Sequence, residues 1–229
     1  MNLTNAITAI TNWGMSSMGE FLFEKLSDPE YYEENREAAH SDHVAYRNWD
    51  EADVWLDPLG RKSSFRLFLD GSWKFHYARN YEQTIHGFEK TEYDCRGWDD
   101  IRVPAHIQME GYDSPQYANT QYPWDGREDV WTDEMPTKFN PVASYVKYFT
   151  LPETFSGERV FISFQGAESG MALWLNGAYV GYSEDSFTPS EFELTEYVKE
   201  GENKLAAQVF KWTASSWCED QDFFRFSGI

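Results

Sequence analysis

The chain is poor in basic residues and in cysteine. Its 19 lysine and arginine residues face 39 aspartate and glutamate residues, which gives a formal net charge of −20. A field of that sign repels nucleic-acid phosphates and anionic membrane surfaces, so we expect neither as a partner. The two cysteines, Cys95 and Cys218, are too few for a disulfide framework, and their separation matches no zinc-ligand spacing.

The sequence also lacks targeting and membrane signals. Residues 1–13 do not combine a basic segment with an apolar core, as a secretory signal peptide would. No apolar run approaches the length of a membrane span. We therefore expect a cytoplasmic protein.

Complete catalytic motifs are missing as well. We find no nucleophile elbow, phosphate-binding glycine loop or metalloprotease helix. Among 39 acidic residues some pair suited to glycoside hydrolysis can always be chosen, so such a pair carries little information. The residues support no self-sufficient active site.

Aromatic residues, in contrast, are abundant. The chain has 10 Trp, 14 Tyr and 17 Phe. Such a content is typical of a β core, and an excess beyond the core often lines contacts with carbohydrate or protein. So many rings would also suit burial between copies of the chain in a homo-oligomer.

Short alternating segments separated by polar turns predict an antiparallel β-sandwich. The clearest pattern is a hairpin, in which 65–69 and 73–77 flank the turn Asp70-Gly71. A second tight turn is predicted at Asn176-Gly177. Further strands are expected over 145–151, 159–165, 172–175, 178–182, 190–194 and 204–212.

The N-terminal region has a different pattern. Residues 1–26 are mildly amphipathic, which predicts one or two short helices. Asp28 followed by Pro29 resembles a helix start, so the acidic stretch 31–39 is predicted to be helical.

Two segments are candidate binding sites. The loop 111–124 alternates hydrogen-bonding side chains with rings, and Asn119 offers both a donor and an acceptor. The run 216–225 places three carboxylates among aromatic rings, which suits the hydroxyls and apolar face of a sugar. The alternatives are a proline-pinned loop that packs its own rings, and a solvated acidic loop with an ion pair to Arg225. The acidic run alone supplies too few ligands for a complete calcium site.

Seven blocks of the chain resemble the N-terminal portion of bacterial β-galactosidases of glycoside hydrolase family 2, in family order. These blocks are 34–41, 69–75, 103–109, 117–123, 174–182, 189–192 and 219–228. The resemblance implies a jelly-roll, galactose-binding-like sandwich over 34–229. Residues 1–33 match no block and form an extension of unknown role. The family places an immunoglobulin-like domain and a catalytic (β/α)8 barrel after this portion, so we expect a piece of a longer enzyme.

The resemblance also assigns site residues. The barrel would supply both catalytic glutamates, so no catalytic residue is expected in this chain, and the barrel is its expected partner. Asn119 would bind the substrate, a terminal β-galactoside such as lactose, which the family hydrolyses with retention. Asp222 would bind both the galactose and a sodium ion. The full-length enzyme would use Na⁺ and Mg²⁺, with neither held firmly by this chain. The segment 124–128 occurs in some family members only, and we expect it to alter the outer subsite.

Two other functions fit the residues. A free-standing lectin-like module would bind galactose without a barrel. A structural assembly domain would bury its aromatic loops against neighbouring domains. Related activities such as β-glucuronidase or β-mannosidase fit less well, because the blocks around Asn119 and Asp222 resemble the galactosidase versions.

Overall fold

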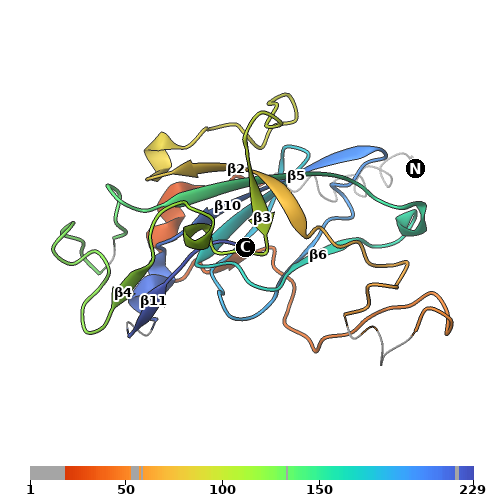
Figure 1. Cartoon of the computed structure of the whole chain (residues 1–229), viewed down its shortest axis with the longest axis horizontal. Coiled ribbons are helices and arrows are strands. Elements are labelled where there is room, and N and C mark those ends of the chain that lie inside the picture. The colour runs from red at the N-terminus through yellow and green to blue at the C-terminus, as the bar shows by residue number, and fades with distance from the viewer. Residues whose placement is uncertain (1–18, 53–56, 58, 133, 220–221) are drawn as a thin grey trace, which may run out of the picture.

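The computed structural model describes residues 19–229 except 53–56, 58, 133, 220 and 221. Its main element is a seven-stranded antiparallel sheet (Figure 1), in the order β1-β8-β7-β10-β5-β2-β3. The strands are β1 Glu33–Glu34, β2 Gly71–Ala78, β3 Asp99–Val103, β5 Val142–Thr150, β7 Gly170–Leu175, β8 Ala178–Ser183 and β10 Glu202–Phe210. Two strand pairs complete the structure, β4 Gln116–Ala118 with β11 Phe223–Arg225, and β6 Phe161–Phe164 with β9 Ser190–Glu193.

Helical structure in the described residues is limited to short 3-10 turns. They are η1 Phe23–Ser27, η2 Tyr81–Gln83, η3 Ile107–Met109, η4 Glu153–Phe155 and η5 Ala214–Trp217. The predicted all-β antiparallel sandwich is confirmed, whereas its jelly-roll strand order stays a prediction.

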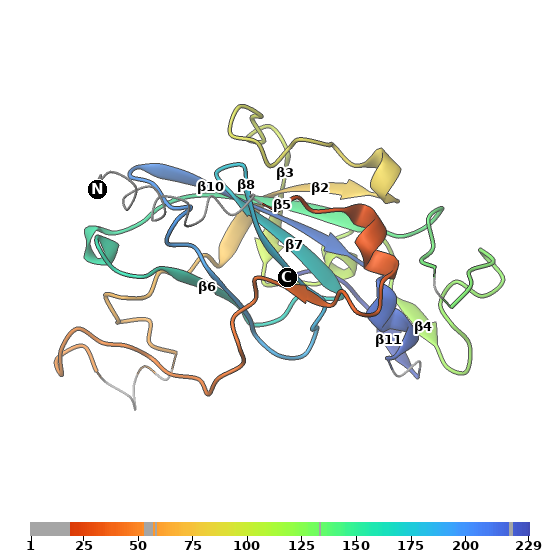
Figure 2. The same cartoon turned by 180° about the vertical axis from the view of Figure 1, so that it is seen from behind.

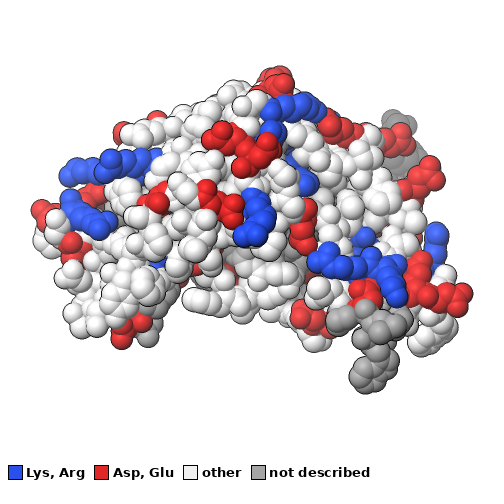
Figure 3. Space-filling view, in the orientation of Figure 1, with Lys and Arg blue, Asp and Glu red and all other residues white. Residues whose placement is uncertain are grey.

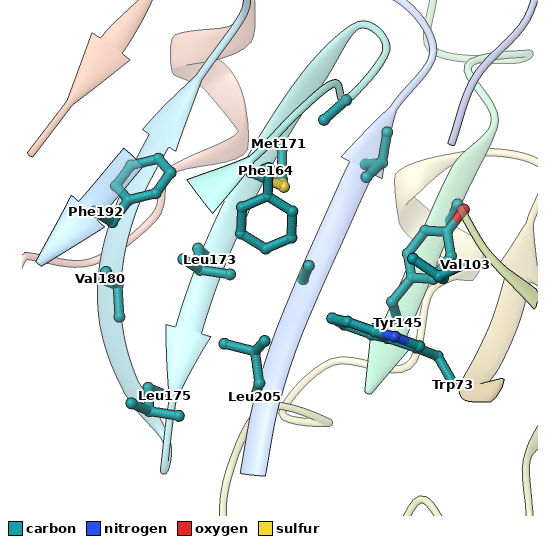
Figure 4. Close-up of a cluster of buried hydrophobic side chains, with 14 of the residues drawn as sticks. Trp73, Val103, Tyr145, Phe164, Met171, Leu173, Leu175, Val180, Phe192 and Leu205 are labelled. Carbon is teal, nitrogen blue, oxygen red and sulfur yellow. The ribbon is translucent and has the colours of Figure 1, made fainter. Parts of the chain in front are cut away.

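The main core lies between one face of the large sheet and the β6–β9 pair. Along β10 the side chains alternate, so that Leu205 enters this core while Phe210 belongs to a cluster on the opposite face. Phe164 of β6 lies beside Met171 and Leu173 of β7, and Phe192 of β9 lies on the β8 side of the cluster, near Val180 (Figure 4). Both faces of the sheet are therefore covered, and β7 and β10 are buried along most of their length.

The N-terminal segment 19–33 covers the second face of the sheet, where Figure 2 shows it in red. Phe21 and Leu26 are 9% and 1% exposed and pack with Phe210 and Tyr182. The ring of Tyr31 stacks on Tyr182 at 5.0 Å between centroids. The described part of the extension thus contributes to the core. The boundary at residue 33 stays a prediction, and the helices expected within 1–18 lie outside the described residues.

The predicted helix over 31–39 is wrong. Glu33 and Glu34 form β1, which pairs with Ser183 and Tyr182 at the edge of β8. Asp28 accepts a hydrogen bond from the Glu30 amide at 2.9 Å, a local turn instead of a helix cap. Pairing with an exposed sheet edge has overridden the local helix signal.

The predicted hairpin over 65–77 is also wrong, because only its second strand forms. β2 is paired on one side with β3 and on the other with β5. Both of its edges are therefore occupied, and residues 65–69 have no free edge to join. They run as an irregular segment, held by a hydrogen bond of 2.7 Å from the Trp73 indole to the Leu69 carbonyl.

The other predicted strands are confirmed to within a few residues. β7 and β8 are joined at Asn176 and Gly177, whose φ angles of 54° and 86° suit a tight hairpin turn. Acidic and basic side chains are interspersed on the face seen in Figure 3. Within the described ranges, no helix has the length and apolar character needed to cross a membrane.

Candidate functional site

The pairing of β4 with β11 brings the two candidate segments together. Tyr117 lies opposite Phe224 in this pair, and Ala118 forms a further bridge with Asp222. Asn119 directly follows Ala118, so Asn119 and Asp222 lie at the same end of the strand pair. Figure 1 shows β4 and β11 side by side at one end of the molecule. The two residues assigned by resemblance are thus neighbours in space, although they are distant in sequence.

A tyrosine hydroxyl links the two predicted residues. The Tyr117 hydroxyl donates a hydrogen bond of 2.5 Å to Oδ1 of Asp222, which lies 105 residues away in sequence. This bond raises the pKa of Tyr117, because the carboxylate favours the protonated hydroxyl, while a hydrogen bond from the Asn119 side chain opposes the shift. Asn119 and Asp222 are both exposed, so an amide and a carboxylate face solvent together. Sequence reasoning missed Tyr117, although it belongs to the block that contains Asn119.

A polar pocket of about 330 Å³ opens beside Asn119. Its lining is mostly amide, hydroxyl and charged side chains, which can both donate to and accept from hydroxyl groups. The lining residues are Gln116, Tyr117, Ala118, Asn119, Thr120, Gln121, Tyr122, Pro123, Asp125 and Arg127. A hydroxylated ligand of the size of a monosaccharide suits a hollow of this kind.

Two of the four rings of the 111–124 loop pack on each other. Trp124 is buried, and its ring stacks on Tyr122 with 5.4 Å between centroids. The ring of Trp217 meets Trp124 edge-on at 4.8 Å between centroids. This confirms that the loop packs its own aromatic side chains. Tyr117 and Phe224 differ, because they are 53% and 57% exposed and lie 5.3 Å apart. They provide the flat apolar surface beside the polar groups.

A buried ion pair anchors the loop before β4. Lys211 Nζ lies 2.6 Å from Asp113 Oδ2, and the two side chains are 1% and 4% exposed. Gln108 donates a second hydrogen bond to the same oxygen at 3.0 Å. Burial lowers the pKa of Lys211, and the attraction of Asp113 opposes that shift. Sequence reasoning missed this pair, although a lysine within the apolar run 209–212 is a usable signal of a buried partner.

A second buried pair lies beneath β11. Arg225, 2% exposed, pairs through Nη1 with Glu219 Oε2. Glu168 lies close to both residues. Burial, and next the negative charge of Glu219, raise the pKa of Glu168 to about 7, while Arg225 opposes that shift. The ion pair that the sequence suggested for Arg225 therefore involves Glu219.

The site has limited capacity for a metal ion. Among the residues that the structure describes, no group of three or more His, Cys, Asp or Glu side chains could hold one. The Asp222 carboxylate is a hard oxygen donor, which fits an alkali or alkaline-earth cation as one ligand of several. A cation here would need ligands from elsewhere.

An antiparallel sandwich that presents an amide, a carboxylate and two exposed rings beside a polar pocket has the features of a carbohydrate-binding domain. The family model described as the sugar binding domain of glycosyl hydrolases family 2 matches residues 67–229. The chain belongs to this family.

Relatives extend the match toward the N-terminus. A β-galactosidase of Halalkalibacterium halodurans is 52% identical over 204 residues, which is 89% of this chain and 20% of that protein. A β-galactosidase of Streptococcus thermophilus is 46% identical, over 93% of this chain and 20% of its own length. The chain thus spans about a fifth of these relatives.

Two further similarities are to a β-galactosidase large subunit and to a solved structure. The β-galactosidase large subunit of Leuconostoc lactis is 42% identical, over 89% of this chain and 33% of that subunit. The crystal structure of a β-glucuronidase of Bacteroides uniformis shares the fold, with a TM-score of 0.52 at 19% identity. That alignment covers 71% of this chain and 16% of the glucuronidase.

Proposed function

We propose that this chain is the substrate-positioning domain of a β-galactosidase that releases terminal, non-reducing β-D-galactose with retention of configuration. The observation that carries the proposal is the β4–β11 pairing, which sets Asn119 beside Asp222 next to a polar pocket. Relatives at 40–52% identity named β-galactosidase, or its large subunit, support the choice of substrate. The catalytic glutamates belong to a barrel outside this chain, which is its main partner.

In this proposal the two residues orient the galactose and take no part in bond cleavage. Asp222 accepts hydrogen bonds from galactose hydroxyls, while Asn119 both donates and accepts. Holding the sugar in a reactive geometry can contribute several kcal/mol to catalysis without a bond being made or broken. The exposed ring of Phe224 lies on the same strand pair and covers the apolar face of the sugar.

We assign sodium binding to the same place. The Asp222 carboxylate would be one ligand of a Na⁺ ion, with the remaining ligands supplied from outside this chain. Bound sodium would supply positive charge that attracts sugar oxygens. We place the magnesium site entirely outside the chain.

We also propose a cytoplasmic location. Cys95 is buried and Cys218 is exposed, both as free thiols, and an unpaired exposed thiol suits a reducing compartment.

The test uses the full-length enzyme and hydrolysis of a nitrophenyl β-galactoside. Asp222→Asn and Asn119→Ala should each lower kcat/KM by roughly ten- to a thousandfold, because a lost hydrogen bond to a charged or tightly held group costs about 1.5–4 kcal/mol. The unfolding temperature should stay unchanged, since both side chains are exposed. Asp94→Asn, at an exposed aspartate that does not line the pocket, is the matched control and should retain activity. A loss of stability without a loss of turnover would instead support a structural assembly domain.

The isolated chain provides a second test. Purified from a host without its own β-galactosidase, it should show no turnover, because the proposed catalytic groups lie elsewhere. It should also bind galactose too weakly for calorimetry. Clear galactose binding by the isolated chain would support a free-standing lectin-like module.

A further inference from the structure

An ion pair holds the buried side of β11, the strand that follows Asp222. Glu219 and Arg225 lie on either side of Asp222 in sequence, and their side chains meet in the interior. Arg225 is 2% exposed, whereas the preceding residue of β11, Phe224, is 57% exposed. The backbone therefore turns Arg225 inward while Asp222 faces outward.

Both ends of the segment that carries Asp222 are fixed to the rest of the domain. On the N-terminal side, Glu184 accepts hydrogen bonds from the Thr213 hydroxyl at 2.9 Å and the Ser215 amide at 3.0 Å. These residues hold η5, which runs directly into Glu219. On the C-terminal side, Gly228 exchanges backbone hydrogen bonds with Glu168 at 3.0 and 3.2 Å. Between these anchors, the ion pair joins Glu219 to Arg225 of β11.

We propose that Arg225, through Glu219, is the positioning residue that fixes the Asp222 carboxylate for the sugar. The inference rests on the proposed function, since it assigns a role to residues that support the same site. The outer side of the segment has a matching restraint, because the Tyr117 hydroxyl donates to Asp222. Asp222 is thus held from the β4 side by Tyr117 and from beneath by the ion pair.

The chemistry of arginine explains why this position requires that residue. A guanidinium offers donors in a rigid planar fork, which sets the direction of a carboxylate partner. A lysine ammonium carries the same charge on a flexible chain and sets no such direction. Lysine at 225 therefore keeps the charge balance of the interior and loses the geometry.

The experiment is performed on the full-length enzyme with the variants Arg225→Lys and Glu219→Gln. We expect each to raise KM for a nitrophenyl β-galactoside by roughly tenfold while kcat changes less, because a displaced contact weakens sugar binding. The double variant should be no worse than the single ones, since both remove one interaction. Arg159→Lys and Glu193→Gln are the matched controls, because this pair on the β6–β9 side is exposed and should leave KM unchanged.

The outcomes separate this inference from the proposed function. A KM unchanged in both Arg225→Lys and Glu219→Gln, with Asp222→Asn impaired, overturns the positioning role alone. An unaffected Asp222→Asn enzyme overturns the proposed function and the inference together. If Arg225→Lys fails to fold, Glu219→Gln decides, because it keeps a neutral hydrogen-bonding group of the same shape. A lower unfolding temperature with unchanged KM shows that the pair is structural only.

Discussion

At the scale of single residues, buried charges determine how the loops of the site are docked. Lys211 and Asp113 form one such pair, and Arg225 and Glu219 form another. Removing a charge from water costs several kcal/mol, and this cost is offset only when the partner is in place. Each pair therefore favours one docked arrangement of its segment over alternatives in which a buried charge lacks its partner.

Lys211→Met tests the pair beneath the 111–124 loop. The change leaves the Asp113 carboxylate buried beside Gln108 without its cation, which should cost about 3–5 kcal/mol of stability. Urea unfolding of the isolated chain measures this loss. The double variant Lys211→Met/Asp113→Asn should recover most of it, because no unpaired charge remains. Arg159→Met removes an exposed ion pair and should barely shift the urea midpoint of unfolding. An equal loss of stability in Lys211→Met and Arg159→Met would contradict the argument.

Glu168 makes stability depend on pH. Its pKa is raised to about 7 from an ordinary value near 4.5, first by burial and then by Glu219. The folded chain thus keeps this proton to a higher pH than the unfolded chain. The free energy of unfolding therefore falls by on the order of 3 kcal/mol as pH rises from 4.5 to 7.

Glu168→Gln should remove this pH dependence, because glutamine is neutral throughout. The variant should be more stable than the parent chain at pH 8 and nearly equal at pH 5, in urea unfolding at both values. Arg225 and Lys211 oppose the shift of Glu168, so they stay unchanged in the comparison. Glu193→Gln is the control, because Arg159 lowers the pKa of Glu193 to about 2, so this carboxylate is ionised at both pH values and its replacement should have the same effect at each. An equal effect of Glu168→Gln at both pH values would contradict the prediction.

Sequence reasoning named the two outward-facing residues of the candidate site and missed Tyr117 and Lys211, which support their segments. Asn119 and Asp222 stand in hydrophilic, aromatic-rich segments, a local pattern that is visible in the chain. The sequence suggested an ion pair for Arg225, whose partner Glu219 is only six positions away. Tyr117 and Lys211 acquire their roles from strand pairing and burial, which bring together residues about a hundred positions apart. Such contacts leave little local trace, apart from a charged residue inside an apolar run.

At the scale of elements, the strands were predictable where alternation coincided with a free pairing edge. β5, β7, β8 and β10 were each predicted, and each has a partner strand on both sides in the sheet. Residues 65–69 alternate equally well, yet both edges of β2 are taken by β3 and β5. Residues 33 and 34 carry helix-favouring side chains, yet they meet the open edge of β8. Edge availability is a property of the whole sheet and is absent from a local window.

The N-terminal segment 19–33 should behave as a structural element of the domain. Leu26 is 1% exposed in a cluster with Phe21, Tyr182 and Phe210, so Leu26→Ala should cost about 2–5 kcal/mol through lost burial and a cavity. Leu22, four residues earlier and 46% exposed, supplies the control, since Leu22→Ala should change stability little. Denaturant unfolding of the isolated chain checks both. Equal effects would mean that the segment is not packed on the sheet as described.

At the scale of the whole molecule, the aromatic content serves packing more than recognition. Satellite clusters around Phe88 and around Trp124 hold long loops against the sheet. Tyr117 and Phe224 are exposed at the site, whereas Trp49 and Trp131 are exposed on other loops. A high aromatic count therefore predicted the β core, and the strand pairing determined which rings are exposed at the candidate site.

The net charge of −20 should make the stability of the chain sensitive to salt. Repulsion among carboxylates opposes the compact state, and added salt screens it as the Debye length falls from about 30 Å at 0.01 M to about 8 Å at 0.15 M. The unfolding temperature of the isolated chain should therefore rise over this range. NaCl and KCl should act equally, because screening depends on ionic strength, and because our proposal takes the other sodium ligands from outside the chain. A stabilisation specific to NaCl that disappears in Asp222→Asn would show instead that the chain completes a sodium site by itself, and the division of that site with a barrel would have to be abandoned.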